Sequence, residues 1–433
     1  MADFRSLLST FQTGTEYKAS TISSSSNSIL KGSTLKQKVE HHLRIAQIRK
    51  ATTSGKDNIS STDDIHIAVC VCIVDEFPQE KIWKAWLDTS YSSDKSKDDS
   101  NVTVDTISAP DLMDNQKISS EIYIHAKFPH RVASPWVKSK LIKKNYRSNW
   151  NDVRIIRAML ALATEALRNS LTTHVLFATE SCIPIATLSE VAIELLGRNE
   201  PHQNKHRSFV DAYKATSKNF TRFDERQCWG ALSPYIPYDT IYKALPGWCL
   251  LSRKHIQKIL DLPEDLGEDL WPAFEKVWAP EELYFPTALA LIGALPSNEV
   301  VRKSLVFAKW DTKAKHQKDR AHPNVYDEEF GYNLVNYVRG EGCFFMRKLK
   351  ARVNLRLWED IVVRKVNVRN GFKDRQVAGN VTHHERGCIR DSASDYDPYE
   401  QFERKRNRQH SSYKNERSFT RQRQSDNYDD CDP

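Results

Sequence analysis

Residues Ile65–Val74 read IHIAVCVCIV, an almost unbroken run of apolar and β-branched side chains. Such a run is typical of a strand that is buried on both faces, as the central strands of parallel sheets are. Two further segments, Glu121–Ala126 and His174–Thr179, predict neighbouring strands. Because helical patterns alternate with these strands, the sequence predicts right-handed βαβ units and a doubly wound, mostly parallel α/β sheet.

The segments between and beyond these strands predict the remaining elements. Apolar side chains that step by three and four positions predict a helix over Val153–Leu167, and Ser148–Asp152 supplies its candidate caps. Ligands of doubly wound sheets bind beyond the carboxyl ends of the strands, where Thr179–Cys182 is expected to lie. The other predicted helices are Leu35–Lys50, Pro78–Leu87, Arg253–Leu260 and Pro280–Ala294, and the other core strands are Trp248–Leu251 and Cys343–Arg347.

Composition suggests one large domain with polar ends. Only 39% of the 433 residues are hydrophobic, which favours polar extensions over a poor core. We expect an N-terminal extension and linker over residues 1–64, a catalytic domain over 65–365 and a disordered basic tail over 366–433, with a surface insertion at residues 90–101. The formal charge of +8 fits an anionic ligand such as a sugar nucleotide, and it fits loose nucleic-acid affinity equally well.

Several sequence features concern location and metals. No run of 18 apolar residues predicts a transmembrane helix, and the first 15 residues lack the pattern of a signal peptide. Four N-x-[S/T] sequons are compatible with a luminal glycoprotein, at Asn58, Asn101, Asn219 and Asn380. The eight cysteines contain no C-x-x-C pair, so no zinc site is predicted, and their disulfide connectivity does not follow from sequence.

The stretch Ala279–Thr287, APEELYFPT, places two acids at a helix start. Proline at the first helical position and acids in the first turn are ordinary helix-start features, so a structural role explains them as well as a catalytic one. Companion motifs lie elsewhere in the chain. They are TESCIPI (Thr179–Ile185), GWCLLSR (Gly247–Arg253), HP (His322–Pro323) and FFMRKL (Phe344–Leu349).

In this order, the motifs resemble those of the core-2/I-branching β-1,6-N-acetylglucosaminyltransferases, glycosyltransferase family 14, and most of all its plant-type and xylosyltransferase-like members. The resemblance covers about residues 65–350. It implies a GT-A-like single domain and an inverting transfer of N-acetylglucosamine or xylose from a UDP-sugar to a glycan or protein hydroxyl. It also implies a Golgi membrane location, a UDP-sugar as co-substrate, and no metal or other cofactor.

The resemblance also implies roles for single residues. Glu282 matches the family's general base, and Lys348, with Arg347 beside it, matches the lysine that binds the donor diphosphate. Residues matched as substrate contacts are Trp248, Glu281, His322, Glu180 and Ser181. The two D-x-D matches, Asp395–Asp397 and Asp430–Asp432, lie in the polar tail rather than after a core strand, which agrees with a family that replaces the metal by basic side chains.

Some alternatives stay open. The family's second diphosphate-binding arginine has two candidates here, Arg320 and Arg339. The family's lead-in to the tryptophan is altered and longer, over Lys243–Trp248, so a catalytically silent member that binds glycans or organises an assembly is the second hypothesis. A nucleic-acid-binding protein is the third, resting on the net charge and on the basic run Arg404–Arg408, although no binding-module motif supports a specific nucleic acid.

Overall fold

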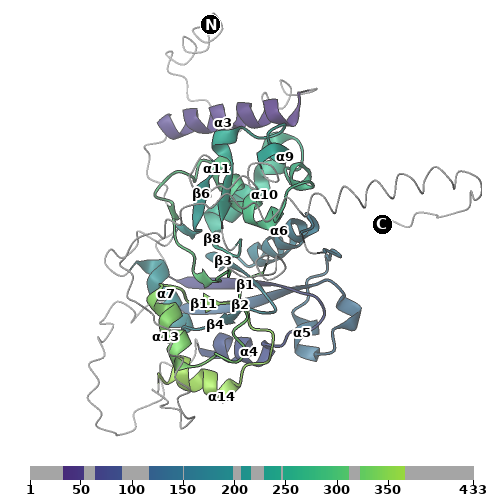
Figure 1. Cartoon of the computed structure of the whole chain (residues 1–433). Helices are drawn as coiled ribbons and strands as arrows, with labels where there is room; N and C mark the ends of the chain where they lie inside the picture. Colours follow the sequence, from purple (N-terminus) through teal and green to yellow (C-terminus); the bar gives the residue numbers. More distant parts are fainter. Residues whose placement is uncertain are drawn as a thin grey trace, which may run out of the picture. The chain divides into compact units, whose positions relative to one another are not determined.

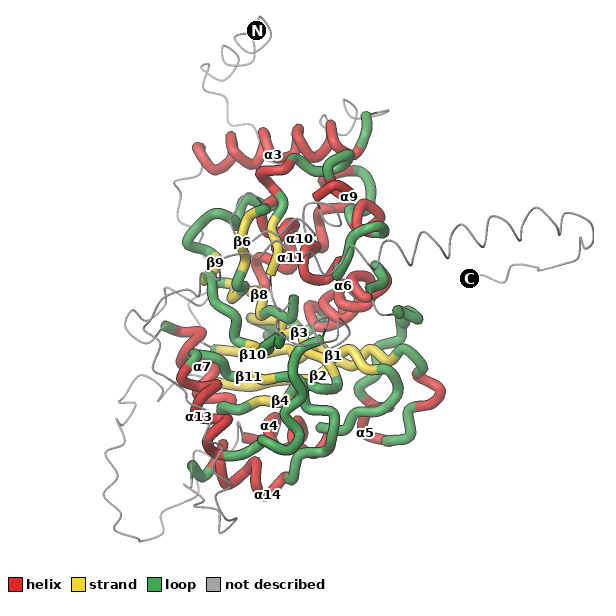
Figure 2. The backbone as a smooth tube through the Cα atoms, viewed as in Figure 1, coloured by secondary structure: helices red, strands yellow, loops and turns green. Residues whose placement is uncertain are grey.

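The computed structural model describes residues 33–52, 64–89, 117–149, 151–197, 206–215, 229–244, 247–311 and 322–365, without the side chains of 47–52. The central sheet has the strand order β2-β1-β3-β8-β5-β9 (Figures 1 and 2). The strands are β1 (Ile65–Ile73), β2 (Ile118–Ala126), β3 (His174–Thr179), β5 (Ser208–Phe209), β8 (Leu250–Ser252) and β9 (Val300–Val301).

The pairing within this sheet is mostly parallel, which confirms the predicted α/β class. Strand β1 runs parallel to both β2 and β3, and β5 runs parallel to β9. Strand β8 is antiparallel to its two neighbours, β3 and β5. All nine residues of β1 are buried, as expected for a strand with a neighbour on each side and cover on both faces.

Helices pack against the sheet through apolar faces. Helix α6 (Arg154–Leu167) contacts β1, β2 and β3, and α4 (Glu80–Asp88) contacts β2. The other helices are α3 (Leu35–Thr52), α5 (Pro135–Ser139), α7 (Leu188–Leu196), α9 (Gly230–Leu232), α10 (Arg253–Leu266), α11 (Pro280–Leu291), α13 (Tyr332–Gly340) and α14 (Leu355–Trp358). Short 3₁₀ turns cover Pro129–Arg131, Tyr238–Thr240 and Trp271–Phe274, and a π-helical turn covers Glu359–Val363.

Two small sheets connect distant motifs. The first has the order β10-β11-β4, in which β4 (Ile183–Pro184) pairs antiparallel with β11 (Phe345–Met346), and β10 is Val306–Phe307. This pairing joins the TESCIPI motif to the FFMRKL motif. The second sheet joins β6 (Ala212–Lys214) to β7 (Tyr242–Ala244), and α11 packs on β7. There the Thr287 hydroxyl bonds both backbone groups of Tyr242.

Helix α3 packs against α10 and α11, although it lies in the segment expected to be an extension. Val39 on this helix is fully buried, and Lys38 forms an ion pair of 2.7 Å with Glu268. No described helix is long and apolar enough to cross a membrane. The five cysteines within the described residues are buried free thiols, at Cys70, Cys72, Cys182, Cys249 and Cys343.

Some local predictions need correction. The strand expected to begin at Trp248 begins at Leu250, and Trp248 precedes it. Helix α6 begins without a side-chain cap at Val153, and Asp152 binds Arg154 instead. The 90–101 insertion, Trp150, the four sequons, both D-x-D matches and the basic tail lie outside the described residues.

Candidate active site

The first part of the site lies where strand β3 ends. Glu180 follows the strand directly, and its backbone N–H donates to the carbonyl of Cys72 near the end of β1, at 3.2 Å. The hydroxyls of Thr179 and Ser181 lie 3.0 Å apart. Burial raises the pKa of Glu180 above its ordinary value, although the positive charges of Arg347 and Lys348 oppose the shift. Glu180 and Ser181 are therefore at the carboxyl edge of the parallel strands, where ligands bind in such sheets.

Three buried tryptophans hold the next residues in place. In an extended segment, every second residue points its carbonyl to the same side. Here, carbonyls of alternate residues each accept a hydrogen bond from an indole N–H. The pairs are Trp83 with Cys182 at 2.9 Å, Trp358 with Pro184 at 2.7 Å, and Trp86 with Ala186 at 2.9 Å. The TESCIPI segment is therefore fixed by side chains from both ends of the described chain.

The Lys348 segment lies beside Ser181. The N–H of Leu349 donates to the carbonyl of Ser181 at 3.0 Å, next to the β4–β11 pairing. Gln79 holds the residues that follow: its amide N–H donates to the carbonyl of Ala351 at 2.6 Å, and its carbonyl accepts from the N–H of Val353 at 3.2 Å. The Gln79 side chain is fully buried, whereas Ala351 is exposed, so Gln79 ties a surface segment to the core.

The HP motif also reaches Lys348 through the backbone. The N–H of Lys348 donates to the carbonyl of Asn324 at 3.3 Å, and its carbonyl accepts from the N–H of Tyr326 at 3.0 Å. Pro323 forms an isolated bridge with Trp310. His322 is half-buried at the start of this segment. The motif thus lies beside the Lys348 backbone.

The start of helix α11 is shaped by two distant residues. Ala279 has a left-handed backbone, with φ of 48°, and its N–H donates to the side-chain oxygen of Asn151 at 2.5 Å. Gly247 lies against the same turn: a Cβ built on it would be 2.8 Å from the carbonyl oxygen of Glu281 and 3.1 Å from the Cα of Glu282. Only a residue without a side chain fits this approach.

The two acids of α11 face different surroundings. Glu282 forms an ion pair with Lys243 of β7, with 3.7 Å between Oε2 and Nζ, and its side chain is 16% exposed. The Oε2 atom of Glu281 is buried and has no hydrogen-bond partner among the described residues. Burial raises the pKa of Glu281, although the charges of Arg347 and Lys243 oppose the shift. Both residues are partly exposed, but the Oε2 atom of Glu281 is buried without a partner in the described ranges, whereas Glu282 is paired with Lys243.

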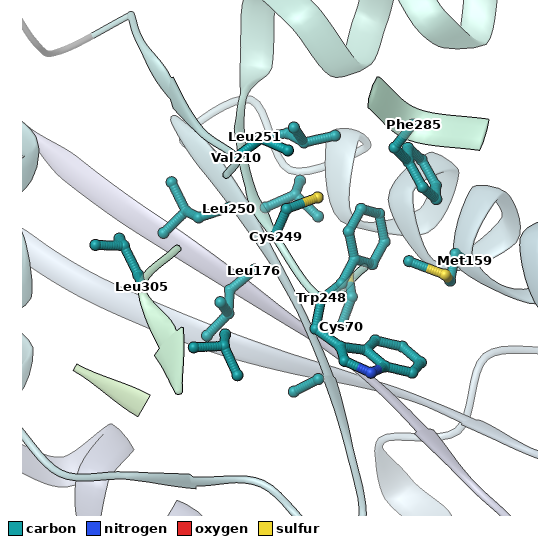
Figure 3. Close-up of a cluster of buried hydrophobic side chains, with 14 of the residues drawn as sticks. Cys70, Met159, Leu176, Val210, Trp248, Cys249, Leu250, Leu251, Phe285 and Leu305 are labelled. Carbon is teal, nitrogen blue, oxygen red and sulfur yellow. The ribbon is translucent and has the colours of Figure 1, made fainter. Parts of the chain in front are cut away.

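Arg347 and Trp248 pack together. The guanidinium carbon lies 5.5 Å from the centre of the Trp248 ring, and Trp248 is 7% exposed within the buried cluster that includes Cys70 and Phe285 (Figure 3). The Nε–H of Arg347 is buried without a hydrogen-bond partner in the described part of the chain. The structure therefore shows Trp248 supporting Arg347 within the core.

Lys348 is half-buried among charges of its own sign. Burial lowers its pKa, and Arg347 and Lys350 lower it further, whereas Glu180 opposes them. Of the two candidates for a second arginine, Arg339 forms an ion pair with Glu190 on α7, and Arg320 lies outside the described residues. No group of three or more His, Cys, Asp or Glu side chains with a metal-binding arrangement occurs in the described ranges.

The sequence-predicted residues thus form one neighbourhood. Glu180 and Ser181 follow β3, and Arg347 and Lys348 lie beside them. Glu281 is near Arg347 and Lys243, and Glu282 pairs with Lys243. Sequence reasoning missed Gln79, Lys243 and Asn151 as site-building residues. Lys243 was visible only as part of the altered tryptophan lead-in, and Asn151 only as a cap candidate for a different helix. Nothing local marked Gln79.

Comparisons with known proteins place the chain in a family. The model of the Core-2/I-Branching enzyme family matches residues 119–338, just over half of the chain, which includes Glu282 and ends before Lys348. Glycosyltransferase BC10 of Oryza sativa subsp. japonica is 23% identical over 211 residues, which are 43% of this chain and 49% of that protein. The match therefore spans about half the length of this relative. The chain belongs to the core-2/I-branching enzyme family.

Proposed function

We propose that this protein is an inverting, metal-independent glycosyltransferase. It moves a sugar, N-acetylglucosamine or xylose, from a UDP-sugar to a hydroxyl of a glycan or protein. The observation that carries the proposal is the meeting of carboxylates and basic groups at the carboxyl edge of the sheet. Within it, Glu281 Oε2 and Arg347 Nε are buried and unpaired in the described part of the chain. Buried polar atoms without partners are rare and are typical of ligand sites.

Glu282 is the proposed general base. It takes the proton from the acceptor hydroxyl while that oxygen forms a bond to the anomeric carbon, and the bond from the anomeric carbon to the diphosphate oxygen breaks. The proton ends on the carboxylate, and UDP leaves with the bonding electrons. Attack from the face opposite the leaving group inverts the anomeric centre. The ammonium of Lys243, 3.7 Å from Glu282, balances the charge of the carboxylate before the proton arrives.

Lys348 and Arg347 are the proposed partners of the departing diphosphate. A planar guanidinium can donate two parallel hydrogen bonds to phosphate oxygens, and a lysine adds a compact positive charge. The unpaired Arg347 Nε supports this role because it leaves a donor for a ligand. The lowered pKa of Lys348 follows from burial beside like charge, a cost that an incoming dianion would relieve.

The test compares two neighbouring carboxylates. Glu282→Gln keeps the shape of the side chain but cannot accept a proton, and loss of a general base typically lowers the rate about a hundred- to ten-thousandfold. The Glu281→Gln variant is the matched control and should lose much less. UDP binding, followed as a rise in melting temperature without added metal, should persist in both variants.

Three results would overturn parts of this proposal. Near-normal transfer by Glu282→Gln would remove the base assignment. A requirement for Mn²⁺ or Mg²⁺, revealed by loss of wild-type transfer in chelator, would remove the metal-independent mechanism. UDP binding by the wild type without any transfer to a panel of acceptors would favour the catalytically silent alternative.

We also propose a Golgi membrane location, on the basis of the family. Its support is membership of the core-2/I-branching family rather than any segment of the described chain. Co-staining of the full-length protein with a Golgi marker in its own cells should show overlap, and a diffuse signal would contradict the proposal.

A further inference from the structure

The segment after strand β2 concentrates positive charge. No Asp or Glu occurs between residues 122 and 151, where seven lysines and arginines occur. We call these seven side chains the basic face: Lys127, Arg131, Lys138, Lys140, Lys143, Lys144 and Arg147. None of them forms an ion pair with a described residue, whereas lysines elsewhere in the described chain, such as Lys84 and Lys303, pair with glutamates. An unneutralised cluster of this kind attracts anionic partners.

Both ends of this segment are tied to the candidate active site. At its start, the N–H groups of Lys127 and Phe128 donate to the carbonyls of Ile73 and Val74, where β1 ends, at 2.9 Å each. Just beyond its end, Asn151 accepts the hydrogen bond from Ala279 that precedes Glu281 and Glu282. The short helix α5 lies between these two anchors in sequence and away from α7 and α13 (Figure 1). The basic face therefore belongs to the loop that borders the proposed acceptor base.

A cavity of about 290 Å³ adjoins the basic face between α6 and α10. Lys144, Tyr146 and Arg157 line it together with apolar side chains of both helices and with Tyr284. Tyr284 is 1% exposed, so the cavity reaches a residue of the buried core. A mixed lining with a few convergent polar groups is typical of a small-ligand site, and the size lies near the lower end of that class.

The aromatic rings of the segment are already covered by cations. The cation–ring pairs are Arg131 with Phe128 at 4.4 Å, Lys84 with Trp136 at 4.9 Å, and Arg157 with Tyr146 at 4.5 Å. The Tyr146 ring also stacks on His125. Proteins that bind single-stranded nucleic acid stack bases on exposed aromatic faces. The covered rings therefore favour an anion that binds through charge and hydrogen bonds alone.

We propose that the basic face binds an acidic acceptor glycan, one that carries carboxylate or sulfate groups, and that the adjoining cavity receives one of its sugar units. This inference rests on the proposed glycosyltransferase function, which it deepens by naming the class of acceptor. The cations hold the charged part of the chain while a hydroxyl of the same glycan reaches Glu282. Binding of this kind weakens with salt, because exposed charges are screened.

The experiment measures direct binding at 0.15 M NaCl with the full-length chain. The probes are an oligogalacturonate for carboxylates, a heparin-derived oligosaccharide for sulfates, a neutral dextran oligosaccharide, and a single-stranded RNA of matched charge. The test variant carries Lys138→Glu and Lys143→Glu, both at exposed positions of the basic face. The control variant carries Lys36→Glu and Lys258→Glu, exposed positions on α3 and α10, so that the net charge changes equally.

We expect the wild type to bind at least one acidic oligosaccharide and not dextran. Two reversed charges, each worth the energy of an exposed ion pair or more, should weaken this binding about tenfold in the test variant and less than twofold in the control. The tail run Arg404–Arg408 is present in every variant and so cancels from the comparison. Equal losses in both variants, binding of dextran, or RNA binding as tight as that of the acidic glycans would each overturn the proposal.

UDP binding, measured in parallel as a shift in melting temperature, separates this inference from the proposed function. If the test variant binds the acidic oligosaccharides as the control does while UDP still binds, only the acidic acceptor is refuted. If the test variant loses binding of the acidic oligosaccharides but the wild type does not bind UDP, only the proposed transfer reaction is refuted.

Discussion

Replacing Gly247 with alanine tests whether the close approach to the start of α11 positions the two carboxylates. The added Cβ would lie 2.8 Å from the carbonyl oxygen of Glu281, whereas ordinary contact begins at 3.4 Å, so the shortfall of 3.4 − 2.8 is about 0.6 Å. The two other near atoms, Glu281 C at 3.0 Å and Glu282 Cα at 3.1 Å, are also backbone. Backbone in a packed turn cannot swing away as a flexible side chain can, so either the start of α11 or the segment that contains Gly247 must move.

The size of the effect follows from that displacement. Overpacking of a well-filled interior typically costs about 1–3 kcal/mol of unfolding free energy. A misplacement of about 1 Å can lower a rate about a hundredfold, so about 0.6 Å should lower transfer about tenfold or more. Urea unfolding measures the first quantity, and the rate of sugar transfer at saturating substrates measures the second.

Gly340 provides the matched control. It lies at the end of α13 with no atom within 4 Å of a built Cβ and without a positive φ. Gly340→Ala should therefore leave transfer unchanged and alter the unfolding free energy by less than about 1 kcal/mol, in the stabilising direction. If Gly247→Ala matched this control in both stability and rate, the proposed packing of Gly247 against Glu281 would be refuted.

Three further predictions follow from single contacts. Lys348→Ala should weaken UDP binding at least about tenfold by calorimetry, because it removes the positive charge proposed to bind the diphosphate. An unchanged affinity would contradict the assignment. Burial lowers the pKa of His125 from 6.5 to about 4 in the folded protein, so the unfolded chain binds more protons between these values. The unfolding free energy, measured by urea unfolding at several pH values, should therefore fall as the pH decreases from 6.5 to about 4. The His125→Gln variant should show a flatter pH dependence, because glutamine can still accept the hydrogen bond from the Tyr146 N–H but does not titrate. Gln79→Leu should cost about 1–3 kcal/mol of unfolding free energy and weaken UDP binding, because the segment after Lys348 loses the two hydrogen bonds that Gln79 makes with Ala351 and Val353. A stability equal to wild type would show that these bonds are not required.

The main strands and helices could be read from local patterns. The apolar run at Ile65–Ile73 predicted a strand buried on both faces, and the structure confirms it. The proline and acids of α11 predicted a helix start within the observed range. The order of the motifs pointed to the family that the comparison then showed. These signals are readable because side-chain periodicity and proline geometry act over a few residues.

The arrangement of the site was decided by tertiary contacts. Asn151 lies 128 positions from Ala279, which it caps, and Gln79 lies 272 positions from Ala351, which it binds. No pattern within one segment encodes such partners, because the same asparagine or glutamine would satisfy many local arrangements. The pairing of Lys243 with Glu282 likewise depends on β7 packing against α11. The sequence by itself therefore determined which residues are candidates for the chemistry. Only the tertiary structure decided how they meet, since long-range packing alone brings their backbones together.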